Sequence, residues 1–400
     1  MRKPHPRSAS LFCAALALAA ASARPAQAQT YRVLYTFSGR GDGAIPQAPL
    51  LLYNGVLYGV TTAGGSSGNG VVFQFNLKTG QQSVVHALAG SPDDASYPDA
   101  GLLGDATGNL YGVSSFGGAD GIGTVFELSL SAPEKIWSFT PGVGQDPLST
   151  LVRDSSGNIY GTTYALGPKG SGTVFKIDTS GTLATLCAFG IRNGGGPIGG
   201  LVLRDGFLYG ATYYGGVNQS GIIYKVSVAT GHETVLYSFT GKADGGYPLG
   251  GLAADADGNL YGTTSVGGTP GNPICPYNEP APGCGTVFKL DTSGNLTTLY
   301  NFSGAADGND PCGTVALDSQ GNLYGTTNGG GTVASGLCSY GCGTVFKLDT
   351  AGNFTTIHSF QGGTDGGGTL AGVTLGEDRV IYGVTAYSDP GYGVVFAIKP

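Results

Sequence analysis

Five aspartates occupy the same place in a repeated sequence pattern and could form a ring of carboxylates. Each lies five residues after the last apolar residue of an aromatic-rich run: Asp42, Asp93, Asp244, Asp307 and Asp365. Two further copies of the pattern carry Gly144 and Gly194 there. An acidic rim of this kind would attract a cation or a cationic ligand. Because Asp-Gly is also a common turn pair, turn formation is the simpler interpretation, and ligand binding at this rim is a hypothesis.

A second acidic pattern looks like part of a calcium-binding loop. Residues 255–259 read Asp-Ala-Asp-Gly-Asn, and calcium loops use alternating oxygen ligands of this type. Other copies hold a bare two-residue turn in this slot, Asn-Gly at 54–55 and Asp-Gly at 205–206. These pairs are strong hairpin signals. We therefore predict a turn here and no cofactor or metal, with calcium as the alternative considered.

The histidines are few and show no catalytic arrangement. Beyond residue 28, His86 and His358 fall in an aromatic position of the pattern, and His232 lies in a predicted turn. The sequence indicates no Ser-His-Asp or Cys-His set, no P-loop and no Cys-x-x-Cys pair. We predict no catalytic residues, and an enzyme is the less favoured interpretation.

Six of the seven cysteines lie after residue 28. Four of them bracket two long loops, as the pairs Cys275–Cys284 and Cys338–Cys342. In an exported protein such pairs indicate local disulfides, whereas a zinc site built from both loops has no support from spacing. Cys187 is predicted to be a buried free thiol. Cys312 is either free or able to exchange with the loop pairs.

The elements that carry these residues come from one repeated unit. A Tyr-Gly pair occurs seven times, at Tyr58, Tyr111, Tyr160, Tyr209, Tyr261, Tyr324 and Tyr382. A run similar to Gly-Thr-Val-Phe follows each pair, with its aromatic at Phe73, Phe126, Phe175, Tyr224, Phe288, Phe346 and Phe396. The two markers alternate strictly, and successive tyrosines are 49 to 63 residues apart. Seven tandem copies of one supersecondary unit are therefore predicted.

Each copy contains four short runs rich in Val, Leu, Tyr, Phe and Thr, bounded by Gly, Asp or Asn. Such runs predict four antiparallel strands, and seven such units predict an all-β, seven-bladed β-propeller over residues 29–400. The chain opens at residues 31–37 with a fourth-strand sequence and ends at 392–398 with a third strand. We predict that these two segments pair and close the ring, because pairing removes two sheet edges. The repeated aromatics are predicted to be core residues.

Repeats that read Gly-Asn-Leu-Tyr-Gly-Thr-Thr, then a Gly-Gly loop, then Gly-Thr-Val-Phe-Lys-Leu resemble the GloVer tandem repeat of secreted bacterial proteins. The resemblance covers residues 31–400. It implies an exported protein built from β-propeller-like repeats, and it supplies no catalytic residues.

Residues 1–28 are typical of a secretory signal peptide. Basic residues precede an apolar run at 11–23, and the Ala-Gln-Ala sequence at 26–28 predicts cleavage after about Ala28. The run is shorter than the ~20 residues of a spanning helix, so we predict a secreted or periplasmic protein without a membrane span. Removal of four basic residues would change the formal net charge from −7 to −11. This charge disfavours nucleic acid as a partner.

These features favour a non-enzymatic binding or interaction propeller for an extracellular or periplasmic ligand: a glycan or other carbohydrate, a protein or a cation. The long loops 267–284 and 329–342 belong to copies five and six. In a four-strand meander they emerge on the same face as the Asp-Gly turns, so we predict the ligand there. The alternative is a carbohydrate-active hydrolase or lyase, or a metal-dependent lactonase, that uses acidic residues at the channel mouth. We expect a monomer.

Overall fold

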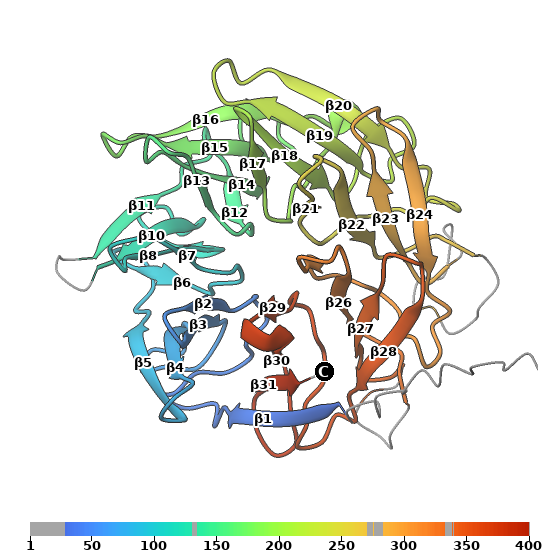
Figure 1. Ribbon diagram of the computed structural model, residues 1–400. Helices are drawn as coiled ribbons and strands as arrows, with labels where there is room; N and C mark the ends of the chain where they lie inside the picture. Colours follow the sequence, from blue (N-terminus) through green and yellow to red (C-terminus); the bar gives the residue numbers. More distant parts are fainter. Residues whose placement is uncertain are drawn as a thin grey trace, which may run out of the picture.

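The computed structural model describes residues 29–129, 134–269, 275, 283–332, 338 and 340–399. Its main strands form seven separate antiparallel sheets arranged in a ring (Figure 1). Within the described residues, helix is limited to two 3-10 turns, η1 (Ile191–Asn193) and η2 (Glu377–Arg379). The predicted seven-bladed β-propeller is therefore confirmed. The predicted leader, residues 1–28, lies outside the described residues.

Each sheet is one blade, with four main strands ordered from the centre of the ring outward. Blade one contains β2 (Leu51–Tyr53), β3 (Val56–Thr61), β4 (Val71–Asn76) and β5 (Gln81–Ala87). Blade two contains β7 (Leu103–Gly104), β8 (Leu110–Ser114), β10 (Thr124–Leu128) and β11 (Lys135–Ser138). Blade three contains β13 (Val152–Arg153), β14 (Ile159–Ala165), β15 (Thr173–Ile177) and β16 (Leu183–Ala188). Blade four contains β17 (Val202–Arg204), β18 (Phe207–Thr212), β19 (Ile222–Ser227) and β20 (Glu233–Ser238).

The remaining blades follow the same order. Blade five contains β21 (Ala253–Ala254), β22 (Leu260–Thr264), β23 (Thr286–Leu290) and β24 (Leu296–Asn301). Blade six contains β25 (Ala316–Leu317), β26 (Leu323–Thr327), β27 (Thr344–Leu348) and β28 (Phe354–Ser359). Blade seven contains β29 (Thr374–Leu375), β30 (Ile381–Thr385), β31 (Val394–Lys399) and β1 (Thr30–Thr36). Three short strands, β6 (Ala95–Ser96), β9 (Phe116–Gly117) and β12 (Gln145–Pro147), lie at the blade ends.

The two ends of the described chain meet in blade seven. Strand β1 pairs antiparallel with β31, from Thr30 opposite Lys399 to Thr36 opposite Val394 (Figure 1). The backbone N–H of Phe37 continues this pairing by donating to the Gly393 carbonyl at 3.0 Å. The predicted ring closure is therefore confirmed, and β31 is an inner neighbour rather than an exposed edge.

The two sequence markers are partners in space. In blade two, Gly112 of the Tyr-Gly pair lies directly opposite Phe126 of the third strand. A Cβ on Gly112 would lie 2.2 Å from the Phe126 ring, and the corresponding distance in the other six blades is 2.4 to 2.7 Å. The glycine thus leaves the space that the aromatic side chain fills. All seven third-strand aromatics are fully buried, which confirms their predicted place in the core.

A second aromatic joins each blade to the next. The residue that follows an outer strand packs its ring on the third-strand aromatic of the following blade, with centroids 4.8 to 5.4 Å apart at six junctions. Such edge-to-face or tilted pairs are favourable beyond their buried area. The junction between blades one and two departs from the pattern, because the buried Leu88 takes the place of the first ring.

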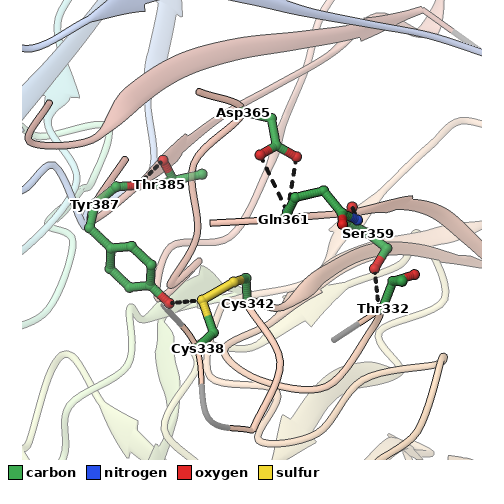
Figure 2. Close-up of a disulfide and its surroundings, with 8 residues drawn as sticks. All are labelled: Thr332, Cys338, Cys342, Ser359, Gln361, Asp365, Thr385 and Tyr387. Carbon is green, nitrogen blue, oxygen red and sulfur yellow. Dashed lines mark hydrogen bonds between the residues drawn. A yellow bond between two sulfur atoms is a disulfide. The ribbon is translucent and has the colours of Figure 1, made fainter. Parts of the chain in front are cut away.

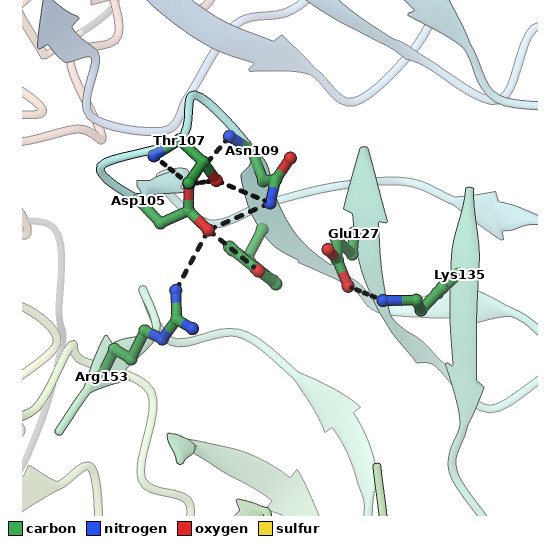
Figure 3. Close-up of polar contacts among 7 residues, drawn as sticks. Asp105, Thr107, Asn109, Glu127, Lys135 and Arg153 are labelled. Carbon is green, nitrogen blue, oxygen red and sulfur yellow. Dashed lines mark hydrogen bonds and ion pairs between the residues drawn. The ribbon is translucent and has the colours of Figure 1, made fainter. Parts of the chain in front are cut away.

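In four blades the hairpin from the first to the second strand is held by an aspartate: Asp105, Asp154, Asp255 or Asp318. In blade two, Asp105 accepts hydrogen bonds from the Thr107 and Asn109 N–H groups at 2.9 and 3.0 Å (Figure 3). Arg153 of blade three donates to the same carboxylate at 3.1 Å. Desolvation acts to raise the pKa of Asp105, but these hydrogen bonds hold it well below its usual range.

The corresponding turn in blade five has the same geometry. The Asn259 N–H donates to Asp255 at 2.9 Å, and the Tyr261 hydroxyl donates to it at 3.0 Å. Both oxygens of the Asp255 carboxylate accept hydrogen bonds from the hairpin itself. The turn interpretation of residues 255–259 therefore agrees with the structure.

Both predicted disulfides are present. Cys275 bonds to Cys284 and Cys338 bonds to Cys342, with Cα atoms 5.1 and 5.3 Å apart. The Tyr387 hydroxyl of blade seven lies 3.2 Å from the Cys338 sulfur (Figure 2). Cys187 and Cys312 are free thiols. In the loop 267–284 only residues 267–269, 275, 283 and 284 are described, whereas in the loop 329–342 residues 333–337 and 339 lie outside the described residues. The strands that flank both loops are described throughout.

We predict that removing residues 29–36, and with them β1, lowers the free energy of unfolding by several kcal/mol. The deletion opens the closed ring and exposes β31 as an unpaired edge, which also favours self-association. Thermal melts by circular dichroism and size-exclusion chromatography would measure both effects. The single substitution Arg32→Ala, at an exposed position of β1, is the control. An unchanged melting temperature in a monomeric deletion variant would contradict the closure argument.

We also predict that Gly112→Ala destabilises the protein by about 1–3 kcal/mol, the usual cost of overpacking a core. The added methyl group would collide with the fully buried Phe126 ring. Gly142→Ala is the matched control, because a Cβ on Gly142 meets nothing within 4 Å. Urea unfolding of the two variants would separate steric conflict from loss of backbone freedom. Equal stability of both variants would show that the facing glycine is not required.

Candidate ligand-binding site at the channel mouth

Seven equivalent backbone bridges lie on one face of the ring. Each joins the segment that enters a first strand to the segment that leaves the second strand of the same blade. The bridged pairs are Ala44–Ala63, Ser96–Phe116, Gln145–Ala165, Gly195–Tyr214, Gly246–Val266, Asn309–Gly329 and Gly367–Tyr387. The blade-to-blade connections and the second-to-third loops therefore share one face, as the meander topology predicts.

The residue after each bridge has an unusual backbone conformation. In all seven blades this residue has φ between 53° and 68°: Ile45, Tyr97, Asp146, Gly196, Tyr247, Asp310 and Gly368. Only two of the seven are glycine, although L side chains rarely adopt this region. Backbone strain that recurs at one place is maintained by surrounding structure and is typical of functional sites.

The residue two positions further on lines a central cavity of about 460 Å³. The seven residues at this position are Gln47, Asp99, Leu148, Ile198, Leu249, Cys312 and Leu370. Pro occupies the intervening position in six blades and Thr369 in the seventh. The backbone framework is thus the same in every copy, whereas the side chains toward the channel differ. We call this cavity and the seven positive-φ residues above it the channel mouth.

Asp310 is a buried polar side chain of the channel mouth. It is 6% exposed and lines the cavity. One carboxylate oxygen, Oδ2, accepts a hydrogen bond from Asn328 Nδ2 at 3.1 Å. The other, Oδ1, is enclosed and has no hydrogen-bond partner. Burial raises the pKa of Asp310, so this carboxyl group holds its proton to a higher pH than an exposed one.

Asp99 contributes a second carboxyl group to the same cavity. It accepts hydrogen bonds from Gln47 Nε2 at 3.1 Å and from Ser115 Oγ at 2.6 Å. Burial raises the pKa of Asp99, and the nearby charge of Asp146 adds to the effect. The two hydrogen bonds oppose this rise because they favour the ionised form.

Four tyrosines form a continuous aromatic cluster across blades three, four and five. The ring centroids are 6.3 Å apart for Tyr164 and Tyr214, 6.4 Å for Tyr214 and Tyr213, and 5.3 Å for Tyr213 and Tyr247. Blade four makes room for them, since a Cβ on Gly196 would lie 2.7 Å from two of these rings. Burial raises the pKa of Tyr164 and Tyr213, so their hydroxyls are neutral hydrogen-bond donors.

The five aspartates of the predicted acidic rim lie elsewhere. None of them lines the channel cavity. Outer-strand tyrosines donate to three of them, with Tyr35 at 2.9 Å from Asp42 and Tyr237 and Tyr300 at 3.0 Å from Asp244 and Asp307. These contacts place the rim beside the outer strands.

The rim aspartates accept most of their hydrogen bonds from their own turns. Backbone N–H groups four residues earlier donate to Asp42, Asp244, Asp307 and Asp365 at 2.7 to 3.0 Å. In the first connection the structure assigns this role to the buried Asp94, while Asp93 is exposed. Counting along the sequence does not show this shift, because residues 88–94 include one additional residue. Ligand binding by the rim stays a prediction.

The sequence interpretation did not identify the channel-mouth residues. A usable signal was present, because six copies share a proline just before the cavity-lining position. The residues on either side of that proline vary from copy to copy, unlike the rest of the repeat. A constant frame with variable neighbours is a pattern that sequence alone could have revealed.

We predict that Asp310→Asn is more stable relative to the wild type at pH 7 than at acid pH. The difference should be about 1.4 kcal/mol for each pH unit by which folding raises the pKa of Asp310. Because the folded-state pKa of Asp310 is raised, the wild type loses stability as pH rises through it, and the amide does not. Urea unfolding at pH 4 and pH 7 would show the difference. Asp205→Asn is the control, since the Asp205 side chain is 83% exposed. A pH-independent difference would contradict burial of an ionisable group.

Comparison with solved structures identifies the fold. An oligogalacturonate lyase from Vibrio parahaemolyticus matches 92% of this chain and 93% of its own, with a TM-score of 0.56 and 11% sequence identity. A putative 6-phosphogluconolactonase from Bacteroides fragilis matches 82% and 86%, with a TM-score of 0.51 and 18% identity. At these identities the similarity shows the propeller fold alone. No curated protein is significantly similar in sequence.

The repeat itself has a defined family. The sequence profile of the Gloeobacter/Verrucomicrobia repeat matches residues 91–274 and 277–400. These two segments contain six of the seven Tyr-Gly markers and cover well over half of the chain. The chain therefore belongs to the Gloeobacter/Verrucomicrobia repeat family.

Proposed function

We propose that this protein is a non-enzymatic carbohydrate-binding propeller. Its ligand would be held at the channel mouth, in the sector between blades three and six. This sector contains the tyrosine cluster and Asp310, and it includes the blades whose long loops suggested a binding face. A sugar ring presents an apolar face that packs on an aromatic ring and hydroxyl groups that require hydrogen-bond partners, and the sector supplies both.

The observation that carries the proposal is the enclosed Oδ1 of Asp310. A buried polar atom without a partner costs about 1–3 kcal/mol, and this atom belongs to a residue that lines a cavity. Because Asp310 lines the cavity, a shift of its side chain would let a ligand hydroxyl supply the missing hydrogen bond. The cavity of about 460 Å³ is within the range of small-molecule sites.

Two features are consistent with a ligand outside the cytoplasm. The chain carries two disulfides, which persist in oxidising compartments. No helix in the described part of the chain is long and apolar enough to cross a membrane. We therefore propose a secreted or periplasmic monomer, consistent with the sequence of residues 1–28.

A glycan array followed by calorimetry on the best soluble oligosaccharide would test the proposal. We predict that Tyr213→Ala weakens binding at least tenfold, since loss of about 1.4 kcal/mol corresponds to that factor. Tyr53→Ala, at the end of β2 on the opposite face, should leave binding unchanged. Asp244→Asn with Asp307→Asn tests the outer rim in the same assay.

The outcomes distinguish binding at the channel mouth from binding at the outer rim. Equal affinity of the wild type and Tyr213→Ala, with the fold intact by circular dichroism, would exclude the channel mouth. Loss of affinity in the rim variants alone would move the site to the outer aspartates. Absence of any oligosaccharide ligand would reject a carbohydrate-binding function.

A second candidate function is catalysis, as a hydrolase, a lyase or a lactonase. The observation that favours it is the presence of two carboxyl groups with raised pKa, Asp99 and Asp310, in one cavity. Carboxyl groups with a raised pKa can act as general acids or bases. Product formation from oligosaccharides or sugar lactones that is abolished in both Asp99→Asn and Asp310→Asn would establish this function.

A further inference from the structure

The junction between blades one and two contains three convergent side chains of metal-binding type. His86 is on the outer strand β5, Asp94 is in the connection to blade two, and Glu134 lies directly before the outer strand β11. His86 Nε2 is 3.2 Å from Asp94 Oδ2 and 3.3 Å from Glu134 Oε2. The three candidate ligand atoms all lie within 4.8 Å of one another.

Two other junctions use the same positions for aromatic packing. At the junction of blades five and six, Tyr300 of the outer strand stacks on Phe354 at 3.9 Å. At the junction of blades six and seven, His358 stacks on Tyr31 at 3.9 Å and also contacts Asp365 at 3.3 Å. Compared with these two junctions, the junction of blades one and two has the carboxylate of Glu134 in place of a ring.

The two distances from His86 Nε2 suit a tetrahedral metal ion. Zinc–nitrogen and zinc–oxygen bonds of about 2.0–2.1 Å place neighbouring tetrahedral ligands roughly 3.3 Å apart. The two distances from His86 have this value. An imidazole in the set favours zinc or a similar transition metal over calcium or magnesium, which prefer oxygen ligands. Two carboxylates would balance the charge of a divalent ion.

The surroundings hold the ligands in place and leave one atom without a partner. Asp94 accepts hydrogen bonds from the Ala89 and Ala95 N–H groups, both at 2.6 Å, so its carboxylate is fixed. Its side chain is 10% exposed, and that of Glu134 is 25% exposed. Glu134 Oε1 is enclosed and has no hydrogen-bond partner. A bound ion would satisfy this carboxylate, through either oxygen.

We propose that His86, Asp94 and Glu134 form a structural site for one divalent transition-metal ion, zinc in preference, that links blades one and two. This junction is the one at which Leu88 replaces the aromatic that packs on the next blade. The ion would supply a cross-blade link where the ring pair is missing. The fourth coordination position is open to water.

Zinc binding to metal-free protein tests the proposal. The protein from residue 29 onward, treated with a chelator and dialysed, would be titrated with Zn²⁺ by calorimetry. We expect one ion per chain and a higher melting temperature. Glu134→Gln keeps the shape of the side chain and should weaken binding about 100-fold. His86→Tyr introduces the residue that other copies use, as Tyr35, Tyr237 and Tyr300 do, and should fold but lose the ion.

The chain offers an internal control. His358 has the same His–Asp arrangement but faces the Tyr31 ring instead of a third ligand, so His358→Tyr should bind zinc as the wild type does. Co²⁺ absorption in the visible range would report tetrahedral coordination in the wild type and its loss in Glu134→Gln. Absence of stoichiometric binding, or equal affinity of the wild type and Glu134→Gln, would overturn the proposal. The three side chains would then be a charged hydrogen-bonded cluster without an ion.

Discussion

The packing of an aromatic ring against the glycine directly opposite it is the contact on which the rest of the ring depends. Each blade is covered on both faces by its neighbours, so its sheet must be thin at the point where a large ring from one strand crosses the next. The glycine provides that space, with Gly112 and Phe126 as the closest example. A ring from the preceding blade then packs on the same aromatic. One contact thereby sets both the internal register of a blade and its distance from its neighbour.

This arrangement separates the parts of the repeat that must stay constant from those that can change. The core aromatics and the glycines opposite them are nearly identical in every copy because each supports a buried contact. The residues at the channel mouth share a backbone conformation but differ in side chain, from Ile45 to Asp310. The seven bridges on that face maintain the strained backbone. The backbone frame therefore accommodates isoleucine, tyrosine or aspartate at positions whose conformation favours glycine.

The architecture could be predicted from the sequence because its determinants are repeated. Tyr-Gly and Gly-Thr-Val-Phe gave the number of blades, and the fourth-strand sequence at residues 31–37 gave the ring closure. The candidate sites could not be predicted in the same way. Asp99 and Asp310 are 211 residues apart, and only the closed ring brings them to one cavity. His86 looked like a substitute for an aromatic residue because Glu134 belongs to another blade. Sequence periodicity describes what the copies share, whereas these sites depend on where they differ.

The near-symmetry of the channel mouth has a consequence for how a ligand would be oriented. Seven identical blades would offer a small molecule seven equivalent orientations about the channel axis, and no single pose would be preferred. Here two tyrosine rings pack against Gly196 on one side, while Asp310 lines the cavity on another. These two departures give the channel a defined rotational reference. A molecule that contacted both would have one orientation about the channel axis, although the backbone frame is nearly the same in all seven blades.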